Sequence, residues 1–232
     1  MTADEIIAEL KELSDPEKIA DLERYAIKTP KWFGIPTPQL KQFARELKKL
    51  VDDRHALAAE LWNSGIYDVR AIAFMIDDPK QVTPEQMDSW CADFDNWATV
   101  DGTCSYLFCR TPFAYSKAFE WAERVPEFEK RAGFSMMAYL AVHDKKAENE
   151  DLAAFFPTIE KHSNDDRNFV KKAVNWALRQ IGKRNFELNE KAIAAAEKIK
   201  ATGTKAGRWI AADAIRELES PAVRERLARR RR

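Results

Sequence analysis

The chain has 232 residues, 45% hydrophobic and 33% charged, which is enough to bury a substantial core as one large domain or one repeat array. Lysine plus arginine and aspartate plus glutamate both total 38, so the net charge alone does not indicate a nucleic-acid ligand. The acidic N-terminus is unlike a signal peptide, no apolar run reaches the ~20 residues of a membrane span, and the three scattered cysteines fit a reducing compartment. We therefore expect a cytoplasmic protein.

Helices are predicted from recurring start signals and from apolar side chains at helical spacing. Thr2-x-x-Glu5 is a capping box. Five further starts combine an N-cap residue with a proline at the first helical position: Asp15-Pro16, Thr37-Pro38, Thr83-Pro84, Thr111-Pro112 and Ser220-Pro221. We expect helices at residues 3–13, 16–27, 38–51, 54–63, 67–77, 84–94, 97–109, 112–124, 127–142, 148–161, 167–184, 187–200, 205–218 and 220–230. No stretch alternates with period two for long enough to predict a strand.

Strong helix starts recur about every forty residues, which is the scale of HEAT-like repeats. They lie at Thr37, Thr83, Val125-Pro126 and Asp165-Asp166. We therefore predict an all-α helical-repeat solenoid, an α–α superhelix whose concave face can hold a long ligand, with a discrete helical bundle as the alternative. No linker rich in Pro, Gly or Ser interrupts the chain, so we expect one domain over residues 1–232 with a frayed basic tail at 229–232.

Trp97 and Asp101 are the most informative pair in the chain. Their spacing of four places both side chains on one helix face, one turn apart. A carboxylate beside an indole suits the holding of a positive charge near a sugar or a base. The alternatives are that Trp97 belongs to the core, as tryptophan on a helix commonly does, and that Asp101 caps or pairs locally.

Two further residues are candidates for a binding surface. Lys172 and Arg179 flank Trp176 on one helix face, an arrangement that suits contact with phosphate and sugar, although a core tryptophan with a solvated basic rim is the alternative. Arg131 begins an apolar helix and could project into a groove, or could be an ordinary surface arginine. The histidines, His55, His143 and His162, are scattered, so the sequence indicates no metal site.

Taken together, these motifs resemble the AlkD-type DNA alkylation repair glycosylases. The shared order is Trp97-x-x-x-Asp101, then Arg131-Ala132, then a helix with Phe-Val-x-Lys-Ala-x-x-Trp-x-Leu-Arg at 169–179. The runs 24–28 and 33–38 also resemble the family's N-terminal segment, and the resemblance covers about residues 20–185. It implies a HEAT-like solenoid that binds duplex DNA in its concave face, mainly through the phosphate backbone. We expect a monomer with no cofactor, no metal and no membrane partner.

The resemblance also implies roles for individual residues. Asp101 matches the catalytic carboxylate, Trp97 and Trp176 match aromatics that pack on the deoxyribose of the lesion, Arg131 matches a basic residue lining the cleft, and Tyr25 matches a position near it. The candidate contacts to the DNA backbone are Lys171, Lys172, Arg179, Lys183 and Arg184, with Lys41, Arg45, Lys205 and Arg208 as further candidates. Two residues depart from the pattern. Asn96 stands where the best-known members carry another tryptophan, and Gly102, directly after Asp101, weakens the helix by up to ~1 kcal/mol relative to alanine.

The implied reaction is hydrolysis of the N-glycosidic bond of a purine alkylated at N3 or N7. Such a base already carries a positive charge and leaves as a neutral molecule, so one carboxylate that stabilises the oxocarbenium-like sugar and orients water is sufficient, where most glycosidases use two. Members of this family are thought to act without drawing the base into a deep pocket, unlike base-flipping glycosylases. The alternatives are a non-catalytic DNA-binding solenoid that senses damaged or distorted DNA, and a protein-interaction scaffold.

Overall fold

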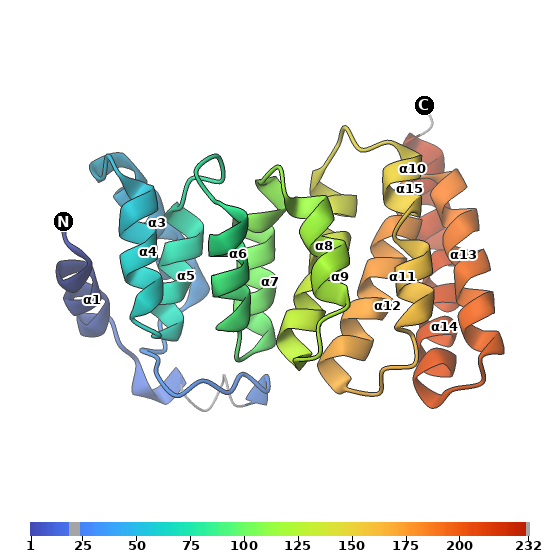
Figure 1. The fold of residues 1–232 in the computed structure, drawn as a ribbon, viewed down its shortest axis with the longest axis horizontal. Coiled ribbons are helices and arrows are strands. Elements are labelled where there is room, and N and C mark those ends of the chain that lie inside the picture. The colour runs from blue at the N-terminus through green and yellow to red at the C-terminus, as the bar shows by residue number, and fades with distance from the viewer. Residues whose placement is uncertain (19–23, 231–232) are drawn as a thin grey trace. The chain divides into compact units, whose positions relative to one another are not determined.

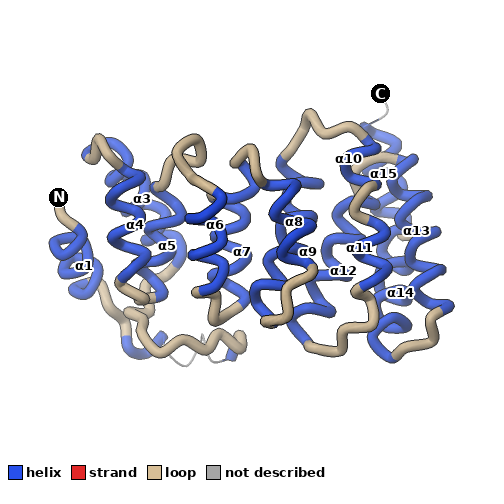
Figure 2. Tube along the Cα trace, in the orientation of Figure 1, coloured by secondary structure: helices blue, strands red, loops and turns tan. Residues whose placement is uncertain are grey.

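In the computed structural model residues 1–18 and 24–230 are described, with the backbone alone for Arg230, and the regular elements in this part of the chain are helices (Figure 2). The α-helices are α1 (Ala3–Glu12), α3 (Thr37–Leu50), α4 (Arg54–Asn63), α5 (Tyr67–Ile76), α6 (Pro84–Ala92), α7 (Trp97–Tyr106), α8 (Ala114–Ala122), α9 (Glu127–His143), α10 (Asn149–Ala153), α11 (Phe156–Lys161), α12 (Asn168–Gly182), α13 (Phe186–Ala201), α14 (Lys205–Leu218) and α15 (Pro221–Arg230). Two 3-10 turns are η1 (Pro16–Lys18) and η2 (Phe108–Arg110). The all-α prediction is confirmed, and none of the helices described is long and apolar enough to span a membrane.

Three of the predicted helix starts have the expected capping hydrogen bonds. Thr2 forms the capping box of α1, in which its hydroxyl accepts from the Glu5 amide at 3.3 Å. Thr83 Oγ1 accepts from the amide of Gln86 at 3.2 Å, and Ser220 Oγ accepts from the third residue beyond it at 3.4 Å. Each cap pairs a backbone N–H that the helix itself leaves without a partner.

The other starts differ from the prediction. Asp15 accepts from the Glu17 amide at 3.1 Å, but the element that begins there is the 3-10 turn η1; residues 19–23 of the predicted helix 16–27 lie outside the described residues, and Ala26 has a left-handed φ of 56°. The start at Thr37 is wrong by one position, because α3 begins at Thr37 itself. The start at Thr111 is wrong, because its hydroxyl donates to the Phe108 carbonyl at 2.9 Å and α8 begins only at Ala114.

Two further predicted helices are interrupted. The segment 148–161 is divided into α10 and α11, because Pro157 has no N–H with which to continue a helix from α10. The segment 97–109 ends as an α-helix at Tyr106 and continues after Leu107 as the turn η2. At the C-terminal end, α15 continues through Arg229 and Arg230, and the remainder of the predicted tail lies outside the described residues.

The helices pack into two compact units, Met1–Pro112 and Phe113–Arg232. In the first unit α5 packs against α3, α4 and α7 (Figure 1). Trp62 of α4 stacks on Trp90 of α6, with ring centroids 4.1 Å apart. In the second unit α9 packs between α8 and α12, while α14 lies beside α12 and α13 packs against both. One continuous domain over the whole chain stays a prediction.

Gly133 allows α9 to approach α8 closely. A Cβ atom at this position would lie 2.4 Å from the Ala122 nitrogen and 2.8 Å from the Ala118 oxygen, both of which belong to backbone that cannot move aside cheaply. We therefore expect Gly133→Ala to lower the free energy of unfolding by about 2 kcal/mol, measured by urea denaturation. Helix propensity alone predicts the opposite sign, so a variant as stable as the wild type, or more stable, contradicts this account of α8–α9 packing.

Candidate nucleic-acid site

Asn96 fixes the start of α7. Its side-chain oxygen accepts from the Thr99 amide at 2.9 Å and its Nδ2 donates to the Thr99 hydroxyl, also at 2.9 Å. The side chain is buried, so asparagine at this position acts as an N-cap. Asn96, which stands where the best-known family members carry tryptophan, therefore fixes the start of α7 and makes Trp97 its first residue.

Partly exposed residues of α7 occur in pairs. They are Trp97-Ala98, Asp101-Gly102 and Ser105-Tyr106, separated by the buried pairs Thr99-Val100 and Thr103-Cys104. Because an α-helix turns by roughly 100° per residue, this alternation places the partly exposed pairs on one side of α7. Trp97 is therefore outside the core, and it shares the partly exposed side of α7 with Asp101.

Trp97 and Tyr25 meet across a long separation in sequence. The indole Nε1 of Trp97 donates to the backbone carbonyl of Tyr25 at 2.9 Å. The Tyr25 side chain is 63% exposed. Two of the residues selected by the family resemblance are thus adjacent, although 72 positions separate them.

A cavity of about 460 Å³ lies in the first unit, beside α7. Most of its described lining is apolar or aromatic. The aromatic members are Tyr25, Tyr67, Phe74, Trp97 and Tyr106, joined by Gly34, Ile35, Pro36, Thr37, Leu40, Ala71, Met75, Ala98 and Gly102, with Lys18 as the charged member. Asp101 is not part of this lining, but its neighbour Gly102 is.

Asp68 holds one wall of the cavity in place. The carboxylate is fully buried, and its oxygens accept from the amides of Phe33 at 2.6 Å and Ile35 at 2.9 Å. Burial raises the pKa of Asp68, while these backbone hydrogen bonds act in the opposite direction. Between them, Gly34 has a φ of 79°, and a Cβ there would lie 2.4 Å from the Asp15 oxygen, so the wall requires glycine.

Gly102 makes room for the ring of Phe74. A Cβ at Gly102 would lie 2.5 Å from Cζ of Phe74, and this ring lies 5.8 Å from that of Tyr106. Gly102, the second residue that departs from the family pattern, therefore lets the ring of Phe74, which lines the cavity, pack directly against the backbone of α7.

The second unit holds Trp176 and Arg131. Trp176 is half-buried and meets the ring of Tyr139 edge-on, with centroids 4.9 Å apart. Arg131 is only 6% exposed, and its Nη1 donates to the Phe169 carbonyl at 2.8 Å, at the start of α12. Arg131 is therefore not an ordinary surface arginine, because it is buried and links α9 to α12. Its place in a DNA-binding groove stays a prediction.

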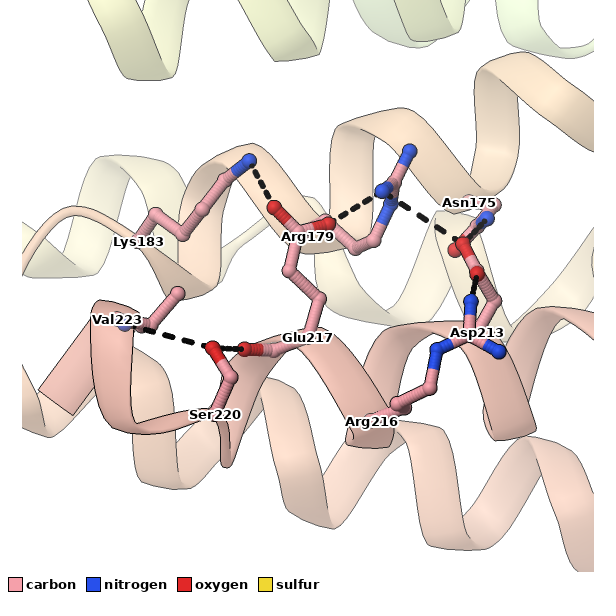
Figure 3. A network of polar contacts seen from close by, with 8 residues as sticks. All are labelled: Asn175, Arg179, Lys183, Asp213, Arg216, Glu217, Ser220 and Val223. Atoms are coloured by element: carbon pink, nitrogen blue, oxygen red, sulfur yellow. Dashed lines mark hydrogen bonds and ion pairs between the residues drawn. The ribbon is translucent and has the colours of Figure 1, made fainter.

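Three of the five main candidate phosphate contacts, Arg179 on α12 and Lys183 and Arg184 directly after it, are engaged within the protein, and Figure 3 shows the first two. Arg179 pairs with Glu217, and also with Asp213 at 3.6 Å, and Lys183 pairs with Glu217 at 2.7 Å. Beyond the end of α12, the guanidinium of Arg184 donates to the Ala141 carbonyl at 3.3 Å. These cations hold helices together, because their partners lie 34 to 43 residues away in the sequence.

Arg179 of α12 and Glu217 of α14 lie toward the C-terminal ends of their helices, whereas the N-terminal ends of α12 and α14 carry exposed basic and aromatic side chains. Lys171 Nζ lies 5.4 Å from the ring centroid of Trp209, a tryptophan that is 41% exposed. Exposed Lys172, Lys205 and Arg208 belong to the same ends of α12 and α14. Trp209 was not among the residues predicted from the sequence. Its position could have been inferred, because Ala206, Ile210 and Ala214 form the apolar stripe of this helix and Trp209 lies outside that stripe.

A basic row runs along α3 in the first unit. Lys41, Arg45 and Lys48 are exposed and share one face at spacings of four and three. Partial burial, and then the positive charges of Arg54 and Arg110, lower the pKa of Lys48, so like charges gather at this end of α3. At the other end, Lys41 Nζ lies 5.8 Å from the ring centroid of Tyr106, which lines the cavity.

The chain is similar to known proteins over most of its length. The family model described as DNA alkylation repair enzyme matches residues 6–218. An uncharacterized protein of Listeria innocua serovar 6a is 23% identical over 201 residues, which are 86% of this chain and 87% of that protein. A solved structure described as a new family of proteins related to the HEAT-like repeat DNA glycosylases with affinity for branched DNA structures matches with a TM-score of 0.74 and 22% identity, over 85% of this chain and 83% of that chain. The predicted HEAT-like fold and the family resemblance are confirmed.

Proposed function

Because the chain belongs to the DNA alkylation repair enzyme family, we propose that it is a DNA N-glycosylase that releases cationic N3- or N7-alkylated purines from duplex DNA. The observation that carries the proposal is the partly exposed side of α7. It holds Asp101 one turn after Trp97, and Trp97, Ala98 and Gly102 of the same helix line an aromatic cavity. A carboxylate in that position suits the stabilisation of a positive charge on a sugar.

The proposed reaction breaks the bond between C1′ of the deoxyribose and the alkylated nitrogen. The electron pair of that bond goes to the base, which leaves uncharged, and the sugar acquires oxocarbenium character. Asp101 stabilises this cation, and Trp97 and Tyr25 shield it from bulk water. A water molecule then attacks C1′ and gives up one proton to solvent, which leaves an abasic sugar with a hydroxyl group on C1′. The exclusion of water strengthens the attraction between the carboxylate and the sugar cation.

Trp176 and Arg131 enter the proposal in different ways. The half-buried ring of Trp176 retains a surface that can pack on a sugar, held from one side by Tyr139. Arg131 acts as a positioning residue, because its guanidinium holds the start of α12 through the Phe169 carbonyl. Lys171 and Lys172 on the same helix are the phosphate contacts that we propose from the original set, since Arg179, Lys183 and Arg184 already have partners inside the protein.

The cysteines favour glycosylase chemistry over direct transfer of an alkyl group to a thiol. Cys91 and Cys104 are fully buried, and Cys109 is buried as well. Burial raises the pKa of Cys109 to about 11, so this thiol stays protonated near neutral pH. A shielded, protonated thiol is a poor acceptor for an alkyl group on DNA.

A direct assay tests the proposal. The protein is incubated with duplex DNA treated with a methylating agent, and free 3-methyladenine and 7-methylguanine are separated by chromatography and quantified. We expect base release by the wild-type protein, in proportion to enzyme and time. If no base is released above the rate in buffer, the protein is not a glycosylase for these lesions.

A second candidate function, damage-sensing DNA binding without catalysis, is favoured by the distribution of basic side chains. Exposed cations gather along α3 and at the Lys171–Trp209 end of α12 and α14, whereas the cations further along α12 are neutralised by acidic partners. Such clustering, despite zero net charge, is the electrostatic pattern of a protein that binds a phosphate backbone. This function predicts salt-dependent binding to distorted duplexes with no release of bases.

Trp209 is expected to contribute to DNA binding under either function. An exposed indole among Lys171, Lys205 and Arg208 suits stacking on a base beside bound phosphates. We expect Trp209→Ala to weaken binding to a duplex with an unpaired base about tenfold, measured by fluorescence anisotropy. Val125→Ala, which truncates another exposed apolar residue of the same unit, is the control, and equal affinities of the two variants contradict a contact at Trp209.

A further inference from the structure

Two cations of α12 and its C-terminal cap share one carboxylate of α14. Glu217 pairs with Arg179 through one oxygen and with Lys183 through the other, at 2.7 Å for Lys183 (Figure 3). We propose that Glu217 occupies the place of a DNA phosphate in the free protein, and that only DNA which also engages Trp176 displaces it. Arg179 and Lys183 then become phosphate contacts through this exchange. The inference rests on the DNA binding that both proposed functions require, and it makes Glu217 a determinant of specificity.

The cations that Glu217 holds belong to the surface proposed for DNA. Four side chains follow one another at spacings of four, three and four residues, which places them on one face of the helix: Lys172, Trp176, Arg179 and Lys183. Lys172 is exposed and the other three are partly exposed. A phosphate backbone that follows Lys172 and Trp176 along this face therefore reaches Arg179 and Lys183, where it meets Glu217.

Carboxylates cancel most of the positive charge at this end of the face. Asp213 lies 3.6 Å from Arg179 and also pairs with Arg216, so three cations face two carboxylates in this network (Figure 3). The side chains of Arg179 and Glu217 are 26% and 30% exposed, so their pair is within reach of a ligand from solvent. Partly exposed ion pairs contribute little to stability, and a phosphate can compete with them.

The guanidinium of Arg179 is only partly used by its present partners. Both of its ion pairs go through Nη1, and among the described residues its buried Nε–H has no hydrogen-bond partner. Arginine binds a phosphate most strongly through two parallel N–H donors, which one shared nitrogen does not provide. Exchange of Glu217 for a phosphate therefore gives Arg179 a more complete set of hydrogen bonds.

Lys183 borders a small basic pocket on its way out of the helix. The pocket, of about 30 Å³, has four cations in its lining, namely Lys145, Lys183, Arg184 and Arg226. Its other described lining residues are Ala141, Val142 and Gln180, so none of them carries a negative charge. A phosphate that displaces Glu217 from Lys183 therefore enters a region of positive potential.

The exchange predicts a difference between undamaged and distorted DNA. An undamaged duplex does not pack on Trp176, so Glu217 keeps its cations and Arg179 and Lys183 neutralise no phosphate. The slope of log K against log salt concentration reports the number of phosphates that a protein neutralises, at roughly 0.9 per phosphate. Removal of the Glu217 charge should therefore make binding to undamaged DNA tighter and more dependent on salt.

The test measures the binding of a fluorescein-labelled duplex by fluorescence anisotropy over a series of KCl concentrations. We expect Glu217→Gln to bind an undamaged duplex about tenfold more tightly than the wild type at low salt, with a slope steeper by about one to two. A duplex with one unpaired base should gain less, so the preference for distorted DNA falls. Glu219→Gln, which removes the same charge at an exposed position two residues further on, is the matched control and should behave as the wild type.

A second set of variants separates this role from that of an ordinary link between helices. If Glu217 only ties α14 to α12, Glu217→Gln lowers the stability in urea and does not raise the affinity for DNA. Addition of Arg179→Gln to Glu217→Gln should return the affinity to near the wild-type value, because the gain depends on the released cation. If Glu217→Gln folds poorly, Asp213→Asn, which removes the second carboxylate near Arg179, is expected to gain about threefold.

The outcomes distinguish the exchange from the glycosylase function. Wild-type affinity and salt slope in Glu217→Gln and Asp213→Asn overturn the inference, and so does an equal gain in Glu219→Gln; base release by the wild type then still supports the glycosylase function. If Glu217→Gln gains affinity and salt dependence while the wild type releases no bases, the exchange stands and the glycosylase function is wrong.

Discussion

Asp101→Asn is expected to lower the single-turnover rate of base release at least about a hundredfold, with little change in affinity for methylated duplex DNA. The substitution preserves the shape of the side chain on the partly exposed side of α7 and removes only its negative charge. In the proposed reaction the alkylated base needs no proton to depart, so the Asp101 carboxylate would be the group whose charge the transition state requires. The cations that we propose for ground-state binding are distant in sequence from Asp101, so the loss should appear in the chemical step.

The matched control is Asp95→Asn. It removes the same charge close to the start of α7, and an asparagine oxygen at this position can still accept from Asn96 Nδ2, which lies 2.6 Å from Asp95 Oδ1 in the wild type. We expect this variant to release bases at close to the wild-type rate. Equal rates for the wild type and Asp101→Asn would mean that Asp101 is not the catalytic carboxylate, and equal losses for both variants would mean that only the general negative potential matters.

The helices were largely predictable because their signals are local. Capping residues and apolar spacing place α4 at the predicted residues and α14 at its predicted bounds. Errors arose where one residue has two local options, or where a helix breaker was overlooked. Thr111 could have capped a helix, but its hydroxyl instead donates to the carbonyl of Phe108 in the turn before it. The predicted helix 148–161 ignored Pro157, a breaker that the sequence itself contains.

The candidate site was also predictable in part: features that follow from the helix period could be inferred, and contacts between residues distant in the sequence could not. The shared side of Trp97 and Asp101 follows from helix period alone, and the paired pattern at 97–98, 101–102 and 105–106 was also available in the sequence. The cavity was not predictable, because one of its walls depends on hydrogen bonds from the Phe33 and Ile35 amides to Asp68, which is more distant in the sequence than any local signal reaches. Nor was the neutralisation of Arg179, whose partner Glu217 lies 38 residues further along the chain.

Asp68→Ala is expected to lower the free energy of unfolding by about 4 kcal/mol, the largest stability loss among the variants considered. The carboxylate accepts from two backbone amides, and its removal leaves the amides of Phe33 and Ile35 without a partner in a largely buried wall. Each unpaired buried donor costs roughly 1–3 kcal/mol. Chemical denaturation monitored by circular dichroism measures the loss, with Asp53→Ala, an exposed helix cap in the same unit, expected to cost about 1 kcal/mol.

Asp68→Asn separates the role of the clamp in the cavity from its role in stability. Its single acceptor oxygen can hold one of the two amides, so we expect a smaller loss of stability than for alanine, and a protein that remains folded at ordinary temperature. With one amide released, the wall formed by Gly34 and Ile35 should lose its fixed position, and base release should fall while DNA binding persists. A folded Asp68→Asn protein with unchanged base release would show that this wall does not contribute to catalysis, and that the clamp serves the fold alone.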